Sequence, residues 1–257
     1  MIDETTTAAK PTGSEPHEWQ CAIEPNCEGG ANMERDEAMA QACAADGIPR
    51  LRFYSWQPWA LSLGYNQDIA QINVQEVERR GYGIVRRPTG GRAVFHAEEI
   101  TYSVAMVGKG EGVQGSYAAI NQALLRGFQL LGAAGIEFNR SQPDFREHYA
   151  SSESASCFSA SALSELVWQG RKLAGSAQRR YSDVLLQHGS ILLGDAHLEI
   201  IDLLNNTSND PNRRERMRQM LRSRTATLAE VFNGATPSFT QIAQALREGF
   251  IQIFSPR

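Results

Sequence analysis

Two side chains capable of covalent chemistry, Cys157 and Lys172, lie fifteen residues apart in the chain. A thiol acts as a nucleophile when a nearby cation stabilises its thiolate and when the sulfur remains accessible. Small residues precede Cys157, and the Lys172 ammonium could stabilise either a thiolate or the oxyanion of a tetrahedral intermediate. The spacing alone also fits a small buried hydrophobe at Cys157 and a solvent-facing side chain at Lys172.

A run of small residues follows the lysine, within residues 171–180 (RKLAGSAQRR). Small side chains let a ligand approach the backbone closely, and exposed N–H groups in a turn can hold a carbonyl or phosphate oxygen. We therefore expect a binding turn at this place. Its residues are Gly175, Ser176, Ala177 and Gln178.

A second glycine-rich segment lies upstream, at residues 86–96 (RRPTGGRAVFH). It lacks the G-x-x-x-x-G-K pattern of a phosphate-binding P-loop, and the sequence has no G-x-G-x-x-G after a strand. A plain β-turn explains the glycines, but the flanking arginines favour a loop that contacts an anion. The candidate binding residues are Arg86, Arg87, Thr89, Gly90, Gly91 and His96.

The histidines and cysteines do not have the spacing of metal ligands. His96 and His188 stand in or near expected strands, where a hydrogen-bonded core histidine is the more common role and a catalytic role ranks second. The four cysteines form no C-x-x-C pair. We therefore expect no metal site and reduced thiols, with Cys21, Cys27 and Cys43 as packing or surface residues.

Length and composition predict a globular protein. The chain has 257 residues, is 42% hydrophobic and carries a formal charge of −4, which argues against a dedicated nucleic-acid binder. Its apolar runs fall short of the ~20 residues of a membrane-spanning helix. Residues 1–16 are polar and lack the apolar core of a signal peptide. We expect them to be a disordered lead-in to one domain over residues 17–257, in a cytoplasmic monomer.

Hydrophobic periodicity and capping residues predict an α+β fold with a mixed, mainly antiparallel sheet flanked by helices. Expected strands lie at residues 51–55, 60–63, 84–85, 93–96, 100–107, 165–168, 171–174, 184–187 and 189–193. The strands at 165–168 and 171–174 should form a hairpin across Gln169 and Gly170. Expected helices lie at residues 32–45, 74–80, 115–134, 198–204 and 211–222, with a last helix that begins at Ser238. Asn32 and Asn73 are the expected N-caps of the first two helices, and Gly47 is expected to end the first. Residues 151–161 should form a loop that carries Cys157.

Taken together, the motifs resemble the biotin/lipoate protein ligase and octanoyltransferase family. The matching segments are RRPTGGRAVFH at residues 86–96, TYSV at 101–104, GRKLAGSAQRR at 170–180 and LQHGSIL at 186–192. This resemblance, over roughly residues 33–193, implies a twisted mixed sheet flanked by helices and an acyl chain held in a tunnel. It also implies that Lys172 contacts the acyl carbonyl and that both glycine-containing segments, with His188, bind the substrate.

One branch of octanoyltransferases in that family combines Thr-Gly-Gly-Arg with a Cys-Phe pair shortly before the lysine. This chain is similar to it, because Arg92 replaces the third glycine of the ligases and Phe158 follows Cys157. The resemblance implies that Cys157 carries an octanoyl or lipoyl group taken from acyl carrier protein, while Lys172 and the N–H groups near Gly175 stabilise the tetrahedral intermediates. The acceptor would be a lysine of a lipoyl domain or of the glycine-cleavage carrier protein, in lipoate biosynthesis, and no cofactor would be needed.

Two alternatives stay open. An ATP-dependent lipoate-protein ligase would use ATP and magnesium to form an acyl-adenylate, with Cys157 as a bystander. A non-catalytic protein that binds acyl groups or lipoyl carriers would keep the scaffold without turnover. Separately, the basic segment RRERMR at residues 213–218 could dock an acidic carrier protein or form a solvated helix face.

Overall fold

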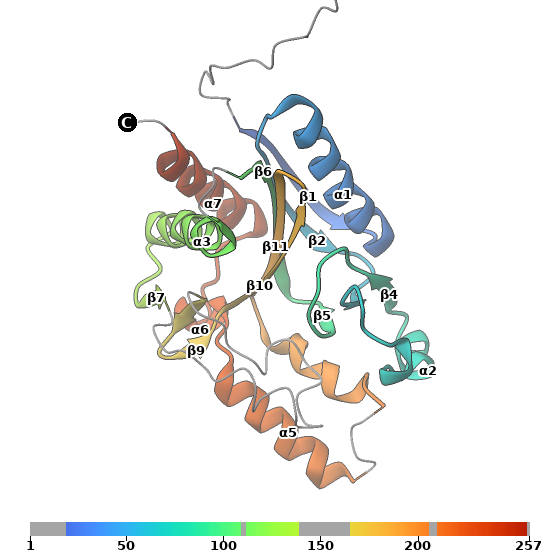
Figure 1. Cartoon of the computed structure of the whole chain (residues 1–257). Coiled ribbons are helices and arrows are strands. Elements are labelled where there is room, and N and C mark those ends of the chain that lie inside the picture. The colour runs from blue at the N-terminus through green and yellow to red at the C-terminus, as the bar shows by residue number, and fades with distance from the viewer. Residues whose placement is uncertain (1–18, 109–111, 139–164, 206–209, 256–257) are drawn as a thin grey trace, which may run out of the picture.

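The computed structural model describes residues 19–108, 112–138, 165–205 and 210–255, and Figure 1 shows how their elements are arranged. Its helices are α1 (Gly29–Asp46), α2 (Val74–Arg79), α3 (Gly112–Leu130), α5 (Pro211–Arg224), α6 (Leu228–Val231) and α7 (Phe239–Phe254), with 3-10 helices η1 (Ile69–Gln71) and η3 (Asp195–Asp202). Its strands are β1 (Gln20–Cys27), β2 (Arg50–Trp56), β3 (Ala60–Leu63), β4 (Gly83–Arg86), β5 (Val94–His96), β6 (Glu99–Val107), β7 (Ile136–Phe138), β8 (Leu166–Trp168), β9 (Arg171–Lys172), β10 (Ala174–Tyr181) and β11 (Val184–Leu192). This mixture of sheets and helices confirms the predicted α+β class.

A five-stranded sheet forms the centre of the fold, in the order β1-β2-β6-β11-β10. β1 runs parallel to β2, whereas the other three neighbouring pairs are antiparallel. The sheet is therefore mixed and mainly antiparallel, as predicted. All nine residues of β11 are buried, which places this strand in the interior of the molecule.

Helices cover both faces of this sheet (Figure 1). Because alternate residues of a strand point to opposite faces, neighbouring leucines of β11 reach different clusters. Leu185 packs with Phe128 of α3 and Phe250 of α7. Leu186 packs on the other face with Cys43 of α1. The main sheet is thus the middle layer between α1 on one side and α3 with α7 on the other.

Two three-stranded sheets complete the fold, in the orders β4-β3-β5 and β7-β8-β9. The predicted strands at residues 51–55 and 60–63 both exist, as β2 and β3, but they belong to different sheets. The turn between them contains a cis Gln57–Pro58 peptide bond. Because β2 and β3 belong to different sheets, the chain passes from the central sheet to the small one at this turn, and strands of both sheets can border one pocket.

Helix α1 begins earlier than predicted, and its N-cap is Glu28 rather than Asn32. The Glu28 carboxylate accepts hydrogen bonds from two backbone N–H groups of the first turn. Asn32 instead lies fully buried inside the helix, where its side-chain oxygen accepts from Arg52 at 2.5 Å. The other end matches the prediction, because Gly47 adopts the left-handed conformation with φ 74°.

Most other elements lie within a few residues of the predictions, but α3 spans residues 112–130 rather than 115–134, and the strand expected at residues 171–174 ends at Lys172. β7 and α6 were not predicted. Asn73 and Ser238 cap α2 and α7 as predicted, and Ser238 forms a reciprocal capping box with Gln241. The helix expected at residues 198–204 is the 3-10 helix η3. The two strands expected on either side of His188 are one continuous strand, β11. Gly189 lies within it at a position where a side chain would not fit, since a Cβ there would come within 2.8 Å of the Gly175 carbonyl oxygen.

Within the described residues, no helix has both the length and the apolar character needed to cross a bilayer. Of the three cysteines in the described residues, Cys43 is buried and Cys21 and Cys27 are partly exposed, and none forms a disulfide.

Candidate active site

A pocket with an empty volume of about 360 Å³, open solvent at its mouth included, lies between the central sheet, the β3–β5 strands and α1. Six of the predicted site residues line it: Arg87, His96, Gly175, Ser176, Ala177 and His188. The sequence did not predict the other lining residues, which are Met33, Tyr54, Trp56, Ser62, Val94, Thr101, Gly189 and Ser190. The fold thus brings the two glycine-containing segments and the histidines into one pocket.

His188 is held in this pocket by a chain of buried hydrogen bonds. Its Nδ1 lies 2.9 Å from Asp36 Oδ2, and its Nε2 lies 2.6 Å from Thr89 Oγ1. The fully buried Asp36 also accepts from Tyr54 OH at 2.9 Å and from Arg52 Nη1 at 3.1 Å. Burial raises the pKa of the Tyr54 phenol well above its ordinary value, so Tyr54 remains a donor. Asp36 of helix α1 therefore fixes the His188 ring, and the ring in turn fixes the Thr89 hydroxyl.

His96, which also lines the pocket, is fixed in a similar way. Its Nδ1 lies 2.7 Å from Glu99 Oε1, and its Nε2 lies 2.7 Å from Ser62 Oγ. Its ring stacks on Trp56, with ring centroids 3.9 Å apart. Ser190 Oγ donates to the same Glu99 oxygen at 2.9 Å. Both histidines are therefore buried and hydrogen-bonded, as predicted, and both also line the pocket.

The predicted turn at residues 175–178 is a strand. These residues belong to β10 and pair with β11, with Gly175 opposite Ser190 and Ser176 opposite Gly189. The prediction of a turn is wrong, because pairing across the sheet overrides the local preference of glycine for turns. Since β10 stands at the edge of the five-stranded order, its alternate N–H groups point away from β11. They could therefore donate to a ligand from a strand edge rather than from a turn.

Ser176 also belongs to a polar network inside the sheet. Its Oγ lies 2.7 Å from Tyr102 OH, which accepts from Gln187 Nε2 at 2.6 Å. Gln178, a predicted substrate-binding residue, donates to Gln187 Oε1 at 2.5 Å and is absent from the pocket lining of described residues. Burial raises the pKa of Tyr102 to about 12, so its hydroxyl stays protonated at neutral pH. The network holds the Ser176 side chain in one orientation.

Lys172 lies on β9, in the hairpin predicted across Gln169 and Gly170. Both turn residues have positive φ, 51° and 72°, as a tight two-residue hairpin turn requires. The Lys172 Nζ lies 2.8 Å from Glu165 Oε1, and the two side chains are only 5% and 4% exposed. The solvent-facing alternative for Lys172 is therefore excluded. A buried ammonium of this kind needs a paired carboxylate, because desolvation of an unpaired charge is unfavourable by several kcal/mol.

The two predicted arginines brace the glycine loop. Arg86 Nη1 donates to the Gly64 carbonyl oxygen at 2.8 Å. Arg87 donates to the Gly90 carbonyl oxygen at 2.8 Å and is 4% exposed. Gly91 has φ 97°, a conformation that favours glycine. These contacts hold the loop against β3, and the anion-contacting role of the arginines stays a prediction.

Gly64 is the point at which β3 meets this loop. A Cβ at Gly64 would collide with the Gly91 carbonyl oxygen, a backbone atom that cannot swing aside. Gly64→Ala is therefore expected to lower the free energy of unfolding by about 1–3 kcal/mol. Gly90→Ala is the matched control, because a Cβ there would meet nothing within 4 Å. Urea unfolding checks this, and equal midpoints for the two variants would contradict the close packing.

Sequence reasoning missed three carboxylates, and each pairs with a residue that it did predict. Asp36 pairs with His188, Glu99 with His96 and Glu165 with Lys172. No motif marks them. One signal could have found such a residue: a charged side chain in an otherwise apolar segment is seldom buried unless it is paired. Glu99, at the start of the buried strand β6, is an example.

The pocket lining does not include every residue that the sequence predicted. Cys157 lies outside the described residues. Arg86, Thr89, Gly90, Gly91 and Lys172 are described, but they do not line the pocket. Among the described parts of the chain, no group of three or more His, Cys, Asp or Glu residues could hold a metal ion.

Comparison with known proteins identifies the family. Residues 28–251 match the lipoyl protein ligase A/B catalytic domain. The chain belongs to this family. It is similar to octanoyltransferase LipM of Brevibacillus brevis, with 38% identity over 241 residues, which cover 91% of this chain and 86% of the relative. It is also similar to octanoyltransferase LipM of Kyrpidia tusciae, with 39% identity over 232 residues, covering 88% and 83%.

Solved structures of lipoate protein ligases share the fold. The bipartite lipoate protein ligase from Thermoplasma acidophilum has a TM-score of 0.71 and 19% identity, covering 92% of this chain and 84% of that chain. A lipoate-protein ligase A bound with ATP has a TM-score of 0.68 and 20% identity, covering 93% and 85%. The family resemblance noted in the sequence is therefore confirmed, together with the lipoate-ligase type of α+β fold.

Proposed function

We propose that this protein is an octanoyltransferase of lipoate biosynthesis that carries the acyl group on Cys157. The observation that carries the proposal is the 38–39% identity, over most of both chains, to relatives named octanoyltransferase LipM. The donor would be acyl carrier protein with an octanoyl, or a lipoyl, thioester. The acceptor would be a lysine of a lipoyl domain or of the glycine-cleavage carrier protein. The T. acidophilum ligase belongs to an archaeal lipoylation system together with its E2 lipoyl domain, which supports the lipoyl-domain acceptor.

The reaction would proceed in two half-reactions. The Cys157 thiolate attacks the thioester carbonyl carbon, the carbonyl-to-carrier C–S bond breaks, and the carrier leaves as a thiolate, which takes up the proton that the Cys157 thiol gave up. The neutral ε-amine of the acceptor lysine then attacks the acyl-cysteine. An amide forms, the Cys157 sulfur leaves and the amine loses a proton. A thioester is already activated relative to an amide, so neither ATP nor another cofactor is needed.

The described residues would serve this chemistry in distinct ways. The Lys172 ammonium, which lies 2.8 Å from Glu165 in the interior, would stabilise the oxyanion of each tetrahedral intermediate. Backbone N–H groups near Gly175 that point away from β11 would add further donors. The acyl chain would occupy the pocket beside Met33 and Val94.

Intact mass spectrometry of the protein mixed with octanoyl-acyl carrier protein, without ATP, tests the proposal. The expected product is an octanoyl adduct that hydroxylamine removes and that peptide mapping places on Cys157. Acylation of a lipoyl domain that appears only with free octanoate, ATP and magnesium would contradict the proposal and support a ligase. Binding of the acyl group without any transfer would support a non-catalytic carrier-binding protein.

A further inference from the structure

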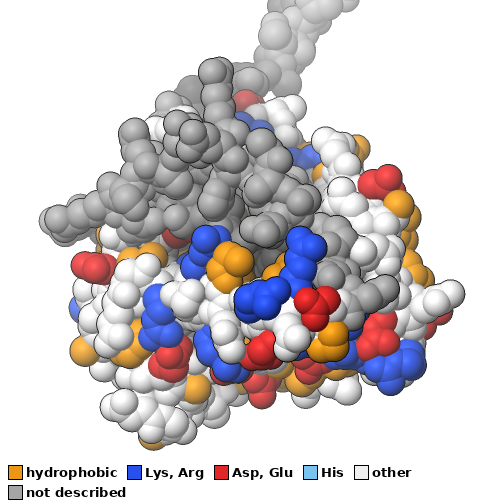
Figure 2. Space-filling view, turned by 90° about the horizontal axis from the view of Figure 1, so that it is seen from below, with side chains coloured by type: hydrophobic (Ala, Val, Ile, Leu, Met, Phe, Trp, Pro, Cys, Tyr) orange, Lys and Arg blue, Asp and Glu red, His pale blue; other side chains and the backbone are white. Residues whose placement is uncertain are grey.

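Helix α5 carries six arginines and one glutamate, in a chain whose net charge is −4. It lies at the lower end of Figure 1, and Figure 2 looks at the molecule from that end, where basic and acidic side chains are interspersed. Three of its arginines pair with carboxylates of η3. Arg214 and Arg218 contact Asp202, and Arg222 contacts Asp195. These pairs attach α5 to η3, and the Arg222–Asp195 pair lies at the surface, with the two side chains 60% and 57% exposed.

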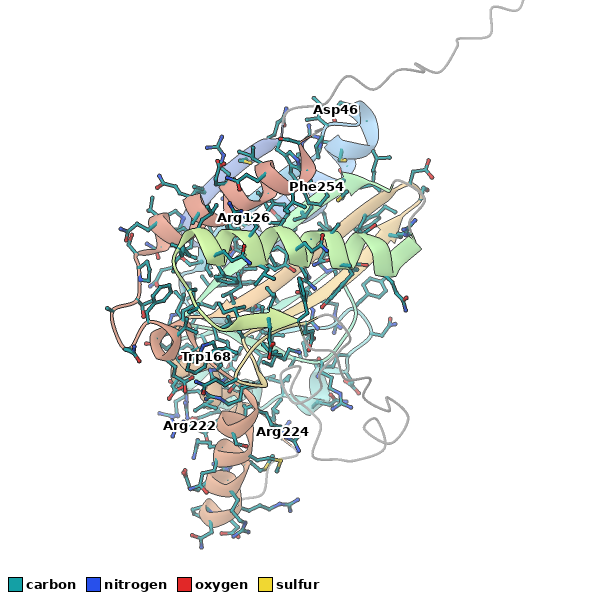
Figure 3. All side chains as sticks on the ribbon, turned by 90° about the vertical axis from the view of Figure 1, so that its left-hand side faces the viewer. Asp46, Arg126, Trp168, Arg222, Arg224 and Phe254 are labelled. Carbon is teal, nitrogen blue, oxygen red and sulfur yellow. The ribbon has the colours of Figure 1, made fainter. Side chains whose placement is uncertain are left out.

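Three other arginines, Arg213, Arg216 and Arg224, form a stripe along one flank of α5. Arg213, Arg216, Met220 and Arg224 follow one another at helical spacing, so they share one face. All four are exposed, and Met220 is 38% exposed. Arg216 contacts Asp210 at 4.0 Å, with both side chains at least half exposed. Figure 3 shows Arg222 and Arg224 on opposite sides of the C-terminal end of α5, so the Arg222–Asp195 pair and the arginine stripe lie on different sides of the helix there.

The arginine stripe ends beside the candidate active site. Thr225, which follows the last residue of α5, forms a β-bridge with Lys172. The N–H of Ala226 donates to the Lys172 carbonyl oxygen at 2.9 Å. The 14 residues of α5 span about 20 Å, and the stripe therefore runs from an outer end of the molecule toward the strand that holds Lys172.

We propose that the arginine stripe docks the acidic carrier protein that delivers the acyl thioester. The inference rests on the function proposed above. Opposite charges on the two surfaces would accelerate encounter and fix the orientation of the carrier, and the flexible Met220 side chain would pack against apolar groups within the contact. A carrier holds its thioester on a long flexible arm, so it can dock beside the reacting atoms. An acceptor lysine sits on its own protein's surface and must itself enter the site, which is why the stripe suits the donor.

The double variant Arg213→Glu with Arg224→Glu tests this inference. Its matched control, Arg79→Glu with Arg247→Glu, makes the same charge change at two exposed arginines of α2 and α7. Acyl-enzyme formation is measured with octanoyl-acyl carrier protein and with octanoyl-pantetheine, a small thioester that has no protein to dock. We expect the double variant to raise KM for the carrier by about tenfold, with kcat within about twofold. We also expect the small thioester and the control variant to behave as in the wild type.

Several outcomes would overturn the docking inference. These are an unchanged KM for the carrier, an equal loss with both donors, or a defect confined to transfer onto the lipoyl domain. Arg213→Gln with Arg224→Gln removes charge without reversing it, and it keeps the test valid if the glutamate variant does not fold. If the wild type forms no acyl-enzyme from either donor, the proposed function itself is overturned, which distinguishes the two failures.

Discussion

Cys157→Ser is expected to abolish both the acyl-enzyme and octanoyl transfer, with a loss of about 10³-fold or more. The physical reason is the ionisation of the nucleophile. A cysteine thiol ionises near pH 8.5 and supplies a thiolate at neutral pH, whereas an unassisted serine hydroxyl does not ionise there. Single-turnover transfer from octanoyl-acyl carrier protein, followed by intact mass spectrometry, measures both losses together.

Cys27→Ser is the matched control for this experiment. Cys27 is a free thiol at the end of β1, and its sulfur accepts from Arg35 at 3.2 Å. We expect Cys27→Ser to form the acyl-enzyme at the wild-type rate. Full transfer by Cys157→Ser would contradict the assignment of the nucleophile, and so would an adduct on another residue in the wild type.

Lys172→Ala is expected to slow both half-reactions by about 10²–10³-fold, because the oxyanion loses its cationic partner. The same change leaves Glu165 in the interior without the ammonium that now lies 2.8 Å away. Removal of one partner of a buried ion pair costs about 3–5 kcal/mol of stability. Urea unfolding should therefore show a large loss of unfolding free energy in addition to the kinetic loss.

A double variant separates the two effects of Lys172. Lys172→Met with Glu165→Gln removes both charges, so we expect it to regain most of the stability but none of the transfer rate. Rates are compared at a temperature at which all variants are folded. Recovery of transfer in the double variant would contradict the catalytic role of Lys172. An unchanged stability of Lys172→Ala would contradict the buried pair.

Strong local signals predicted much of the fold. The N-caps Asn73 and Ser238, the stop at Gly47 and the hairpin across Gln169 and Gly170 all appear in the structure. Each depends on a few adjacent residues. Strand β1 escaped prediction because it contains Pro25 and polar residues, features that are tolerated since β1 lies at the edge of the sheet.

The sequence by itself determined the α+β class, the family and six of the residues that line the pocket, because periodicity, caps and linear motifs are local properties of the chain. Only the tertiary structure decided that residues 175–178 form an edge strand and that Asp36, Glu99 and Glu165 pair with the predicted site residues. His188 and Asp36, for example, stand 152 residues apart in the chain and meet at 2.9 Å. Such contacts follow from strand register and helix packing across the sheet, which no short stretch of sequence encodes.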